Sequence, residues 1–254
     1  MSLSKSQSPN ARVTKGRRNS ATLICTTLTL SLSALVLLLA PFLAPFALAH
    51  DLSADNAAFV QQLYGPAPGP FLYLGAKHMF TGTDHLLFLL GVIFFLYRSK
   101  DIVFYVTLFT IGHSLTLLLG VWANWQVDEH LVDTVIGLSV VYKAFENMGG
   151  FRKVFGIEPD TRIAVLVFGL CHGLGLATKL QGYINSGDGL LTNLISFNVG
   201  VELGQLGALS LMLIALVYWR RHAGFERHAF AANILLMCAG FVLAGNQLTG
   251  YLFT

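Results

Sequence analysis

The stretch Gly75-Ala-Lys-His-Met-Phe-Thr-Gly-Thr-Asp-His-Leu-Leu-Phe-Leu-Leu90 opens a strongly apolar run that continues to Tyr97. It places two histidines and an aspartate within a segment long enough to cross a membrane as a helix. A charged aspartate at the centre of a bilayer costs roughly 2.5 to 3.5 kcal/mol on insertion scales, and intramembrane groups of this kind usually mark functional sites.

The spacing of these polar residues suggests that they act together. His78 and His85 lie about two helical turns apart, so a continuous helix would place them on one face, with Asp84 about a third of a turn away. Gly82 between them leaves room for a neighbouring helix, or for local unwinding around a ligand. The pattern favours a metal-binding or proton-relay site. The alternative is a set of interhelical hydrogen bonds that fixes the packing.

Composition identifies the class of protein. The 254 residues are 54% hydrophobic and 11% charged, whereas about 25% of the residues of a soluble domain are charged. We therefore expect an integral membrane protein with one polytopic domain in a lipid bilayer. The basic residues lie at the ends of apolar segments, which argues against a nucleic-acid partner. The sequence holds no GxSxG, HExxH or phosphate-binding glycine motif, so we expect neither an enzyme nor an organic cofactor.

The first 49 residues have the three parts of a signal peptide in sequence: a basic region, an apolar stretch, and Ala47-Leu48-Ala49 as a cleavage site. The alternative is an uncleaved anchor helix, which would leave the orientation of all later spans unchanged. Cleavage after Ala49 would make His50 the first residue. Its free amino group and imidazole would then form a metal chelate, unless His50 is an ordinary tail residue.

The rest of the chain predicts an all-α, polytopic bundle of transmembrane helices. A short segment, 50–70, ends in a proline-rich turn that delivers the chain to the membrane. The domain 71–254 follows, with about six apolar spans near the roughly 20 residues that a bilayer requires. The predicted spans are 71–97, 102–122, 132–148, 162–180, 190–219 and 229–253.

The connections between spans predict orientation. Lysine and arginine follow the first, third and fifth spans, whereas the other two connections carry none. The positive-inside rule makes the basic connections cytoplasmic. We therefore expect a multi-pass protein of the bacterial inner membrane, with the mature N-terminus and the C-terminus in the periplasm.

Three further spans carry polar residues at membrane depth. His113 lies in the second span and His172 in the fourth, each near the middle. Glu202 lies in the fifth, with Asn198 and Gln205 at helical spacing on the same face. Imidazole and carboxylate together suit Ni²⁺, Zn²⁺ or Co²⁺, whereas Mg²⁺ and Ca²⁺ prefer oxygen ligands.

Four stretches carry a resemblance to a known family. They are Gly75-x-x-His-x-x-x-Gly-x-Asp-His-Leu-Leu-Phe-Leu-Leu90, Phe109-Thr-x-Gly-His-Ser-x-Thr116, Phe168-Gly-x-x-His-Gly-Leu-Gly175 and Phe197-Asn-x-Gly-Val-Glu-x-Gly-Gln205. In this order they resemble the second, broader branch of the HupE/UreJ family of membrane proteins. That family is associated with hydrogenase and urease maturation and looks like a set of secondary nickel permeases.

The resemblance implies a set of metal-pathway residues. They are His78, Asp84, His85, His113, His172 and Glu202. Apart from the resemblance, the cleavage site adds His50, and the shared face of the fifth span adds Asn198 and Gln205, as accessory candidates. The span-four motif of the first branch holds a second histidine and a glutamate, which this chain lacks after Gly173. The resemblance implies nickel as the favoured substrate, and because of this departure from the first branch zinc and cobalt are kept as alternatives.

The leading functional hypothesis is a secondary permease for a divalent transition metal. Asp84 or Glu202 would exchange a proton for the ion, because ligands must deprotonate to bind metal. The first alternative is a membrane haem or redox protein with axial histidines. The second is an accessory protein for metalloenzyme maturation that binds metal without transporting it. A second copy of the chain and metalloenzyme maturation proteins are candidate partners.

Overall fold

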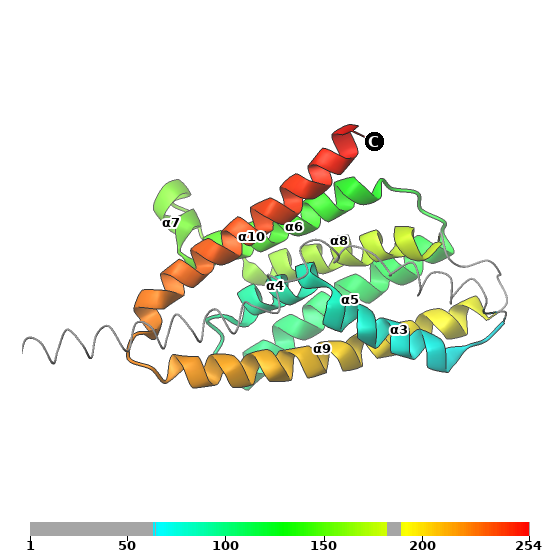
Figure 1. The fold of residues 1–254 in the computed structure, drawn as a ribbon, viewed down its shortest axis with the longest axis horizontal. Helices are drawn as coiled ribbons and strands as arrows, with labels where there is room; N and C mark the ends of the chain where they lie inside the picture. Colours follow the sequence, from blue (N-terminus) through cyan, green and yellow to red (C-terminus); the bar gives the residue numbers. More distant parts are fainter. Residues whose placement is uncertain (1–62, 64, 182–188, 254) are drawn as a thin grey trace, which may run out of the picture.

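A computed structural model describes residue 63, residues 65–181 and residues 189–253 (Figure 1). The predicted leader and His50 lie outside the described residues. The part described is entirely helical, as the apolar spans predict. Its helices are α3 (Pro68–Thr81), α4 (Thr83–Ile93), α5 (Ser99–Trp122), α6 (Glu129–Asn147), α7 (Gly150–Phe155), α8 (Thr161–Gln181), α9 (Leu190–Arg220) and α10 (Phe225–Phe253).

The predicted first span, 71–97, is not one helix. It is divided into α3 and α4 at Gly82, whose backbone is extended, with φ −69° and ψ 97°. The Gly82 amide donates to the His78 carbonyl oxygen and closes the last turn of α3. The expectation of a continuous helix is therefore wrong, and local unwinding at Gly82 is what occurs.

Helix α4 forms the centre of the bundle. Every residue from Leu87 to Ile93 is buried, although the segment is almost wholly apolar and could have faced lipid. It lies among α6, α9 and α10 (Figure 1). A short helix covered in this way can end inside the membrane region, because protein rather than lipid surrounds its unpaired backbone groups.

Helices α3 and α9 pack backbone to backbone and run parallel. A Cβ atom added at Gly200 would strike the Leu72 carbonyl, and one added at Gly204 would meet the backbone of Ala76. Because both contacts advance along both helices in the same direction, the helices are parallel. The Gly200–Gly204 pair thus permits the close approach expected of a GxxxG motif.

Close backbone contacts at glycines, here called glycine seams, also hold the other two helix pairs. Helices α5 and α8 are parallel, with Gly169 against the Phe109 carbonyl and Gly173 against the His113 carbonyl. Helices α6 and α10 are antiparallel, and Gly137 approaches the backbone of Ala244 there. Three close-packed pairs therefore surround α4 (Figure 1).

The basic connections gather at one end of the bundle. Arg220, at the end of α9, donates to the carbonyl oxygens of Ile93, Phe94 and Leu96 at 2.6–2.9 Å, which satisfies acceptors left free where α4 ends. Asn147, at the end of α6, donates to the Gly91 carbonyl at 2.8 Å. In Figure 1, α7 and the connection from α9 to α10 lie at this same end.

The outer surface of the bundle is apolar. Four described helices, α5, α8, α9 and α10, are long and apolar enough to cross a membrane. Many of their large apolar side chains face outward, including Ile111 (54% exposed) and Leu206 (60% exposed). An apolar exterior of this extent is suited to lipid rather than water. The protein is a multi-pass membrane protein.

Candidate metal centre

The break at Gly82 brings two histidines together. His78 lies in the last turn of α3 and His85 in the first turn of α4, with ring centroids 4.9 Å apart. A Cβ atom at Gly82 would lie 2.9 Å from His85 Nδ1 and 3.3 Å from Asp84 Oδ1. A side chain at this position would therefore press on both polar groups, which accounts for glycine between them.

The parallel pair of α5 and α8 supplies two more histidines. The ring centroids of His113 and His172 lie 5.8 Å and 4.8 Å from that of His85. The contact of Gly173 with the His113 carbonyl places these two histidines at the same level of the bundle. His85 is therefore the centre of a cluster to which four helices contribute.

Two hydrogen bonds fix the orientation of the imidazoles. His85 Nδ1 lies 3.0 Å from Asp84 Oδ1, and His172 Nδ1 lies 2.7 Å from the Phe168 carbonyl oxygen. A carboxylate and a carbonyl only accept hydrogen bonds, so each Nδ1 is the donor. In the neutral rings Nε2 then carries the lone pair. Carboxylate–histidine and carbonyl–histidine contacts of this kind orient metal-binding imidazoles in proteins.

The remaining ring nitrogens are buried without hydrogen-bond partners. Within the described residues this holds for Nε2 of His78, His85 and His172 and for both ring nitrogens of His113. A buried polar group left unpaired costs about 1–3 kcal/mol. Several such groups converging on one point indicate a ligand that accepts nitrogen lone pairs.

The distances within the cluster fit a metal ion. One ligand atom from each of His78, His85 and His113 lies within 4.8 Å of the other two, and the same holds for Asp84, His85 and His172. Nitrogen ligands sit about 2.0–2.1 Å from a bound divalent ion. Small side-chain rotations would therefore bring either set to coordinating distance.

Aromatic side chains form the wall of the cluster. Phe109 stacks on His113 with centroids 6.1 Å apart, Phe88 lies 5.5 Å from His172, and Phe197 lies 6.1 Å from His78. These rings exclude water, and charge–charge attraction is stronger in the resulting low dielectric. Asp84 and a divalent cation would attract each other strongly here.

A buried ion pair between α6 and α8 was not predicted from the sequence. Lys179 Nζ lies 2.7 Å from Asp133 Oδ2; the side chain of Asp133 is buried and that of Lys179 is partly buried. Lys179 follows His172 by about two turns of the same helix. The available signal was a charged residue inside each of two apolar segments, a rare feature that calls for a partner.

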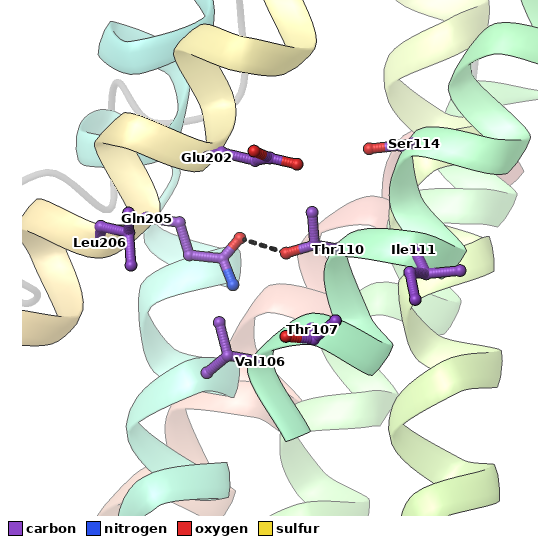
Figure 2. Close-up of a pocket in the computed structure, with 8 residues that line it drawn as sticks. All are labelled: Val106, Thr107, Thr110, Ile111, Ser114, Glu202, Gln205 and Leu206. Carbon is purple, nitrogen blue, oxygen red and sulfur yellow. Dashed lines mark hydrogen bonds between the residues drawn. The ribbon is translucent and has the colours of Figure 1, made fainter. Parts of the chain in front are cut away.

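Two of the fifth-span candidates line a separate pocket. Glu202 and Gln205 line a pocket between α5 and α9, and Figure 2 shows both side chains directed toward α5. Asn198 donates to the Leu194 carbonyl in its own helix at 3.0 Å. Of the six metal candidates, five thus come together around His85, and Glu202 is not among them.

Comparison with known proteins gives one match. Residues 54–254 match the family model described as HupE / UreJ protein. Searches of the curated proteins and of the solved structures gave no match. The matched range covers most of the chain and includes every residue of the histidine cluster. The chain therefore belongs to the HupE/UreJ family of membrane proteins.

Proposed function

We propose that the protein is a secondary permease for a divalent transition metal, with Ni²⁺ as the favoured substrate. The observation that carries this proposal is the convergence of unpaired imidazole nitrogens beside Asp84 in the buried interior of the bundle. Nitrogen and carboxylate ligands favour nickel, zinc or cobalt over magnesium or calcium. Membership of a family associated with nickel transport supports the same choice.

The broken helix supports transport rather than static binding. Discontinuous membrane helices are common at the ion sites of secondary transporters, where the break lines the binding site. Here the break at Gly82 lies between two of the proposed ligands. The sequence carries no nucleotide-binding motif, so an ion gradient would supply the energy.

The haem alternative gains no support from the geometry. The rings of His78, His113 and His172 surround His85, with Phe88 and Phe109 packed against them. A haem needs a flat slot between two axial ligands, and these contacts fill the space where it would lie. Absorbance of the purified protein at haem wavelengths tests this directly.

Metal uptake into proteoliposomes tests the proposed function. We expect the wild type to accumulate Ni²⁺ and His85→Ala and His113→Ala to lose most uptake, because each substitution removes a central ligand. Asn246→Ala is the control, because Asn246 is exposed on α10, outside the cluster. Parallel uptake of Co²⁺ and Zn²⁺ ranks the substrates. Metal binding by the wild type without uptake would indicate the accessory-protein alternative instead.

We also propose six spans, with α3 and α4 together forming the first, and a leader at 1–49 followed by a periplasmic segment at 50–70. The gathering of the basic connections at one end of the bundle supports a cytoplasmic location for that end in the bacterial inner membrane.

This topology predicts that a reporter fused after Thr254 reads as periplasmic. A fusion in the connection between α9 and α10, after Arg221, should read as cytoplasmic in the same cells, because the basic residues hold that end inside. Terminal sequencing of the purified protein should give His50 as the first residue. A cytoplasmic reading after Thr254 would contradict the six-span arrangement.

A further inference from the structure

The pocket between α5 and α9 is a second polar site in the membrane region. Its volume is about 310 Å³. Figure 2 shows Glu202 and Gln205 on α9 facing Thr110 and Ser114 on α5 across the space. Because a water molecule takes about 30 Å³ in the liquid, the pocket has room for several waters.

The pocket is separate from the metal centre. None of its lining residues is a histidine of the cluster or Asp84. Glu202 is itself exposed on the outer face of α9, where Val199, Leu203 and Leu206 are exposed apolar neighbours. Twelve residues into a helix of 31, it lies about 18 Å from the start of that helix, at 1.5 Å per residue.

The carboxylate of Glu202 lacks a partner in the described part of the chain. No described residue forms a hydrogen bond or an ion pair with it, and it is the only ionisable residue among those that line the pocket. On the face of α9 toward α3, Gly200 and Gly204 contact Leu72 and Ala76, and Lys77 is the charged residue of α3 beside this contact. An unpaired carboxylate at membrane depth is costly, so it requires a cation or a proton.

The chemistry of the lining excludes a second nickel site. The carboxylate, the hydroxyl groups of Thr107, Thr110 and Ser114 and the amide of Gln205 supply neither imidazole nor thiolate. Thr110 donates to Gln205 Oε1 at 3.1 Å, which holds the amide in place. Gln205 is 1% exposed, and its Nε2 has no partner in the described structure.

We propose that Glu202 is the proton-coupling site of the transporter: it binds and releases one proton in each transport cycle, through water held by Gln205, Thr110 and Ser114. The inference rests on the proposed transport function, but the site can be tested without transport. When Glu202 is protonated, it carries no charge and the energetic cost of a charge in the membrane is removed. When Glu202 is ionised, water in the pocket hydrates the carboxylate and reduces that cost.

A hydrophobic carbodiimide tests the site in the purified full chain. Such reagents partition into lipid and react with a carboxyl group only in its protonated form. We expect mass spectrometry to find one label at Glu202, with labelling that falls as the pH is raised and is unaffected by Na⁺. Glu202→Gln should abolish the label, and Glu202→Asp should retain it. Glu226→Gln, a change in the first turn of α10, should leave it unchanged.

Three results of this labelling would overturn the proposal. Absence of the label at Glu202 at every pH would mean that the carboxyl is not protonated. Labelling that does not change with pH would show that the group does not exchange its proton. Protection by Na⁺ at constant pH would assign the pocket to sodium instead.

Transport assays distinguish a role of Glu202 in proton coupling from a role in metal binding. In proteoliposomes, Glu202→Gln should retain exchange of internal for external Ni²⁺ and lose the stimulation of uptake by a pH gradient. Loss of exchange in Glu202→Gln, in a protein that still binds Ni²⁺, would contradict a role confined to coupling. Failure of the wild type to exchange nickel would defeat the proposed function, while the labelling result would still decide whether Glu202 carries a proton.

Discussion

Replacement of Asp84 by asparagine is expected to weaken Ni²⁺ binding by about 10- to 100-fold, the usual cost of losing a carboxylate partner of a metal-binding histidine. The carboxylate accepts the proton of His85 Nδ1 at 3.0 Å and so directs Nε2 of that ring into the cluster. Asparagine keeps the size and one acceptor oxygen but loses the negative charge that offsets a bound dication. Uptake should fall with affinity, while insertion and folding persist.

The matched control is Asp101→Asn. Asp101 also lies in the first turn of a helix, but it is exposed at the start of α5. Titration calorimetry with Ni²⁺ and uptake at equal expression compare the two variants. If Asp84 served only as an interhelical hydrogen-bond partner, asparagine would replace it well, because such bonds average about 0.6 kcal/mol. Normal nickel binding by Asp84→Asn would remove this aspartate from the centre of the site.

The histidine cluster was predictable from sequence because membrane interiors restrict what polar residues can do. His113 and His172 lie in apolar spans where water cannot satisfy them, so they must find partners in the protein or bind a ligand. In the structure, the glycines beside them, Gly112 and Gly173, allow close helix contact. What could not be predicted was that His85 would take the central place, since that depends on how three helix pairs surround α4.

The break at Gly82 could not be predicted from the helical periodicity of the sequence. The spacing of His78 and His85 fits one helical face, and the apolar run that follows is long enough to continue one membrane helix. The rings do meet, but across an interruption that turns the chain between them. A helix break inside the membrane region leaves carbonyl groups unpaired, which is tolerated only where other parts of the protein cover them. A local sequence pattern does not show whether such cover is present. The local signal was Gly82 between Thr81 and Thr83, which are weak helix formers.

The position of Glu202 is a second feature that the sequence could not predict. Its spacing with Asn198 and Gln205 identified a polar face of α9, but which helix that face meets is a property of the whole bundle. Gln205 faces α5 and bonds with Thr110, whereas Asn198 bonds within its own helix. The separation of Glu202 from the histidines follows from the glycine seam that turns the neighbouring face of α9 toward α3.

The second large effect is expected from a substitution at the contact between α5 and α8. Gly173 follows His172 directly, and a Cβ atom at this position would strike the carbonyl of His113 and the hydroxyl of Thr116. Thr116 also donates to the Leu170 carbonyl across the seam at 2.7 Å. Gly173→Ala must therefore push the two helices apart at the level of two proposed ligands.

We expect Gly173→Ala to destabilise the protein by about 1–3 kcal/mol, the typical cost of overpacking, and to abolish most nickel binding in the molecules that still fold. Gly245→Ala is the control, because a Cβ atom there meets nothing within 4 Å; its nickel binding should equal that of the wild type and its stability should be equal or higher by up to about 1 kcal/mol. Denaturation in detergent micelles measures the first effect and calorimetry the second. Because the backbone of α5 cannot yield without moving the His113 ring, the two effects should appear together. Unchanged nickel affinity in a destabilised Gly173→Ala protein would show that the spacing of His113 and His172 does not control the site.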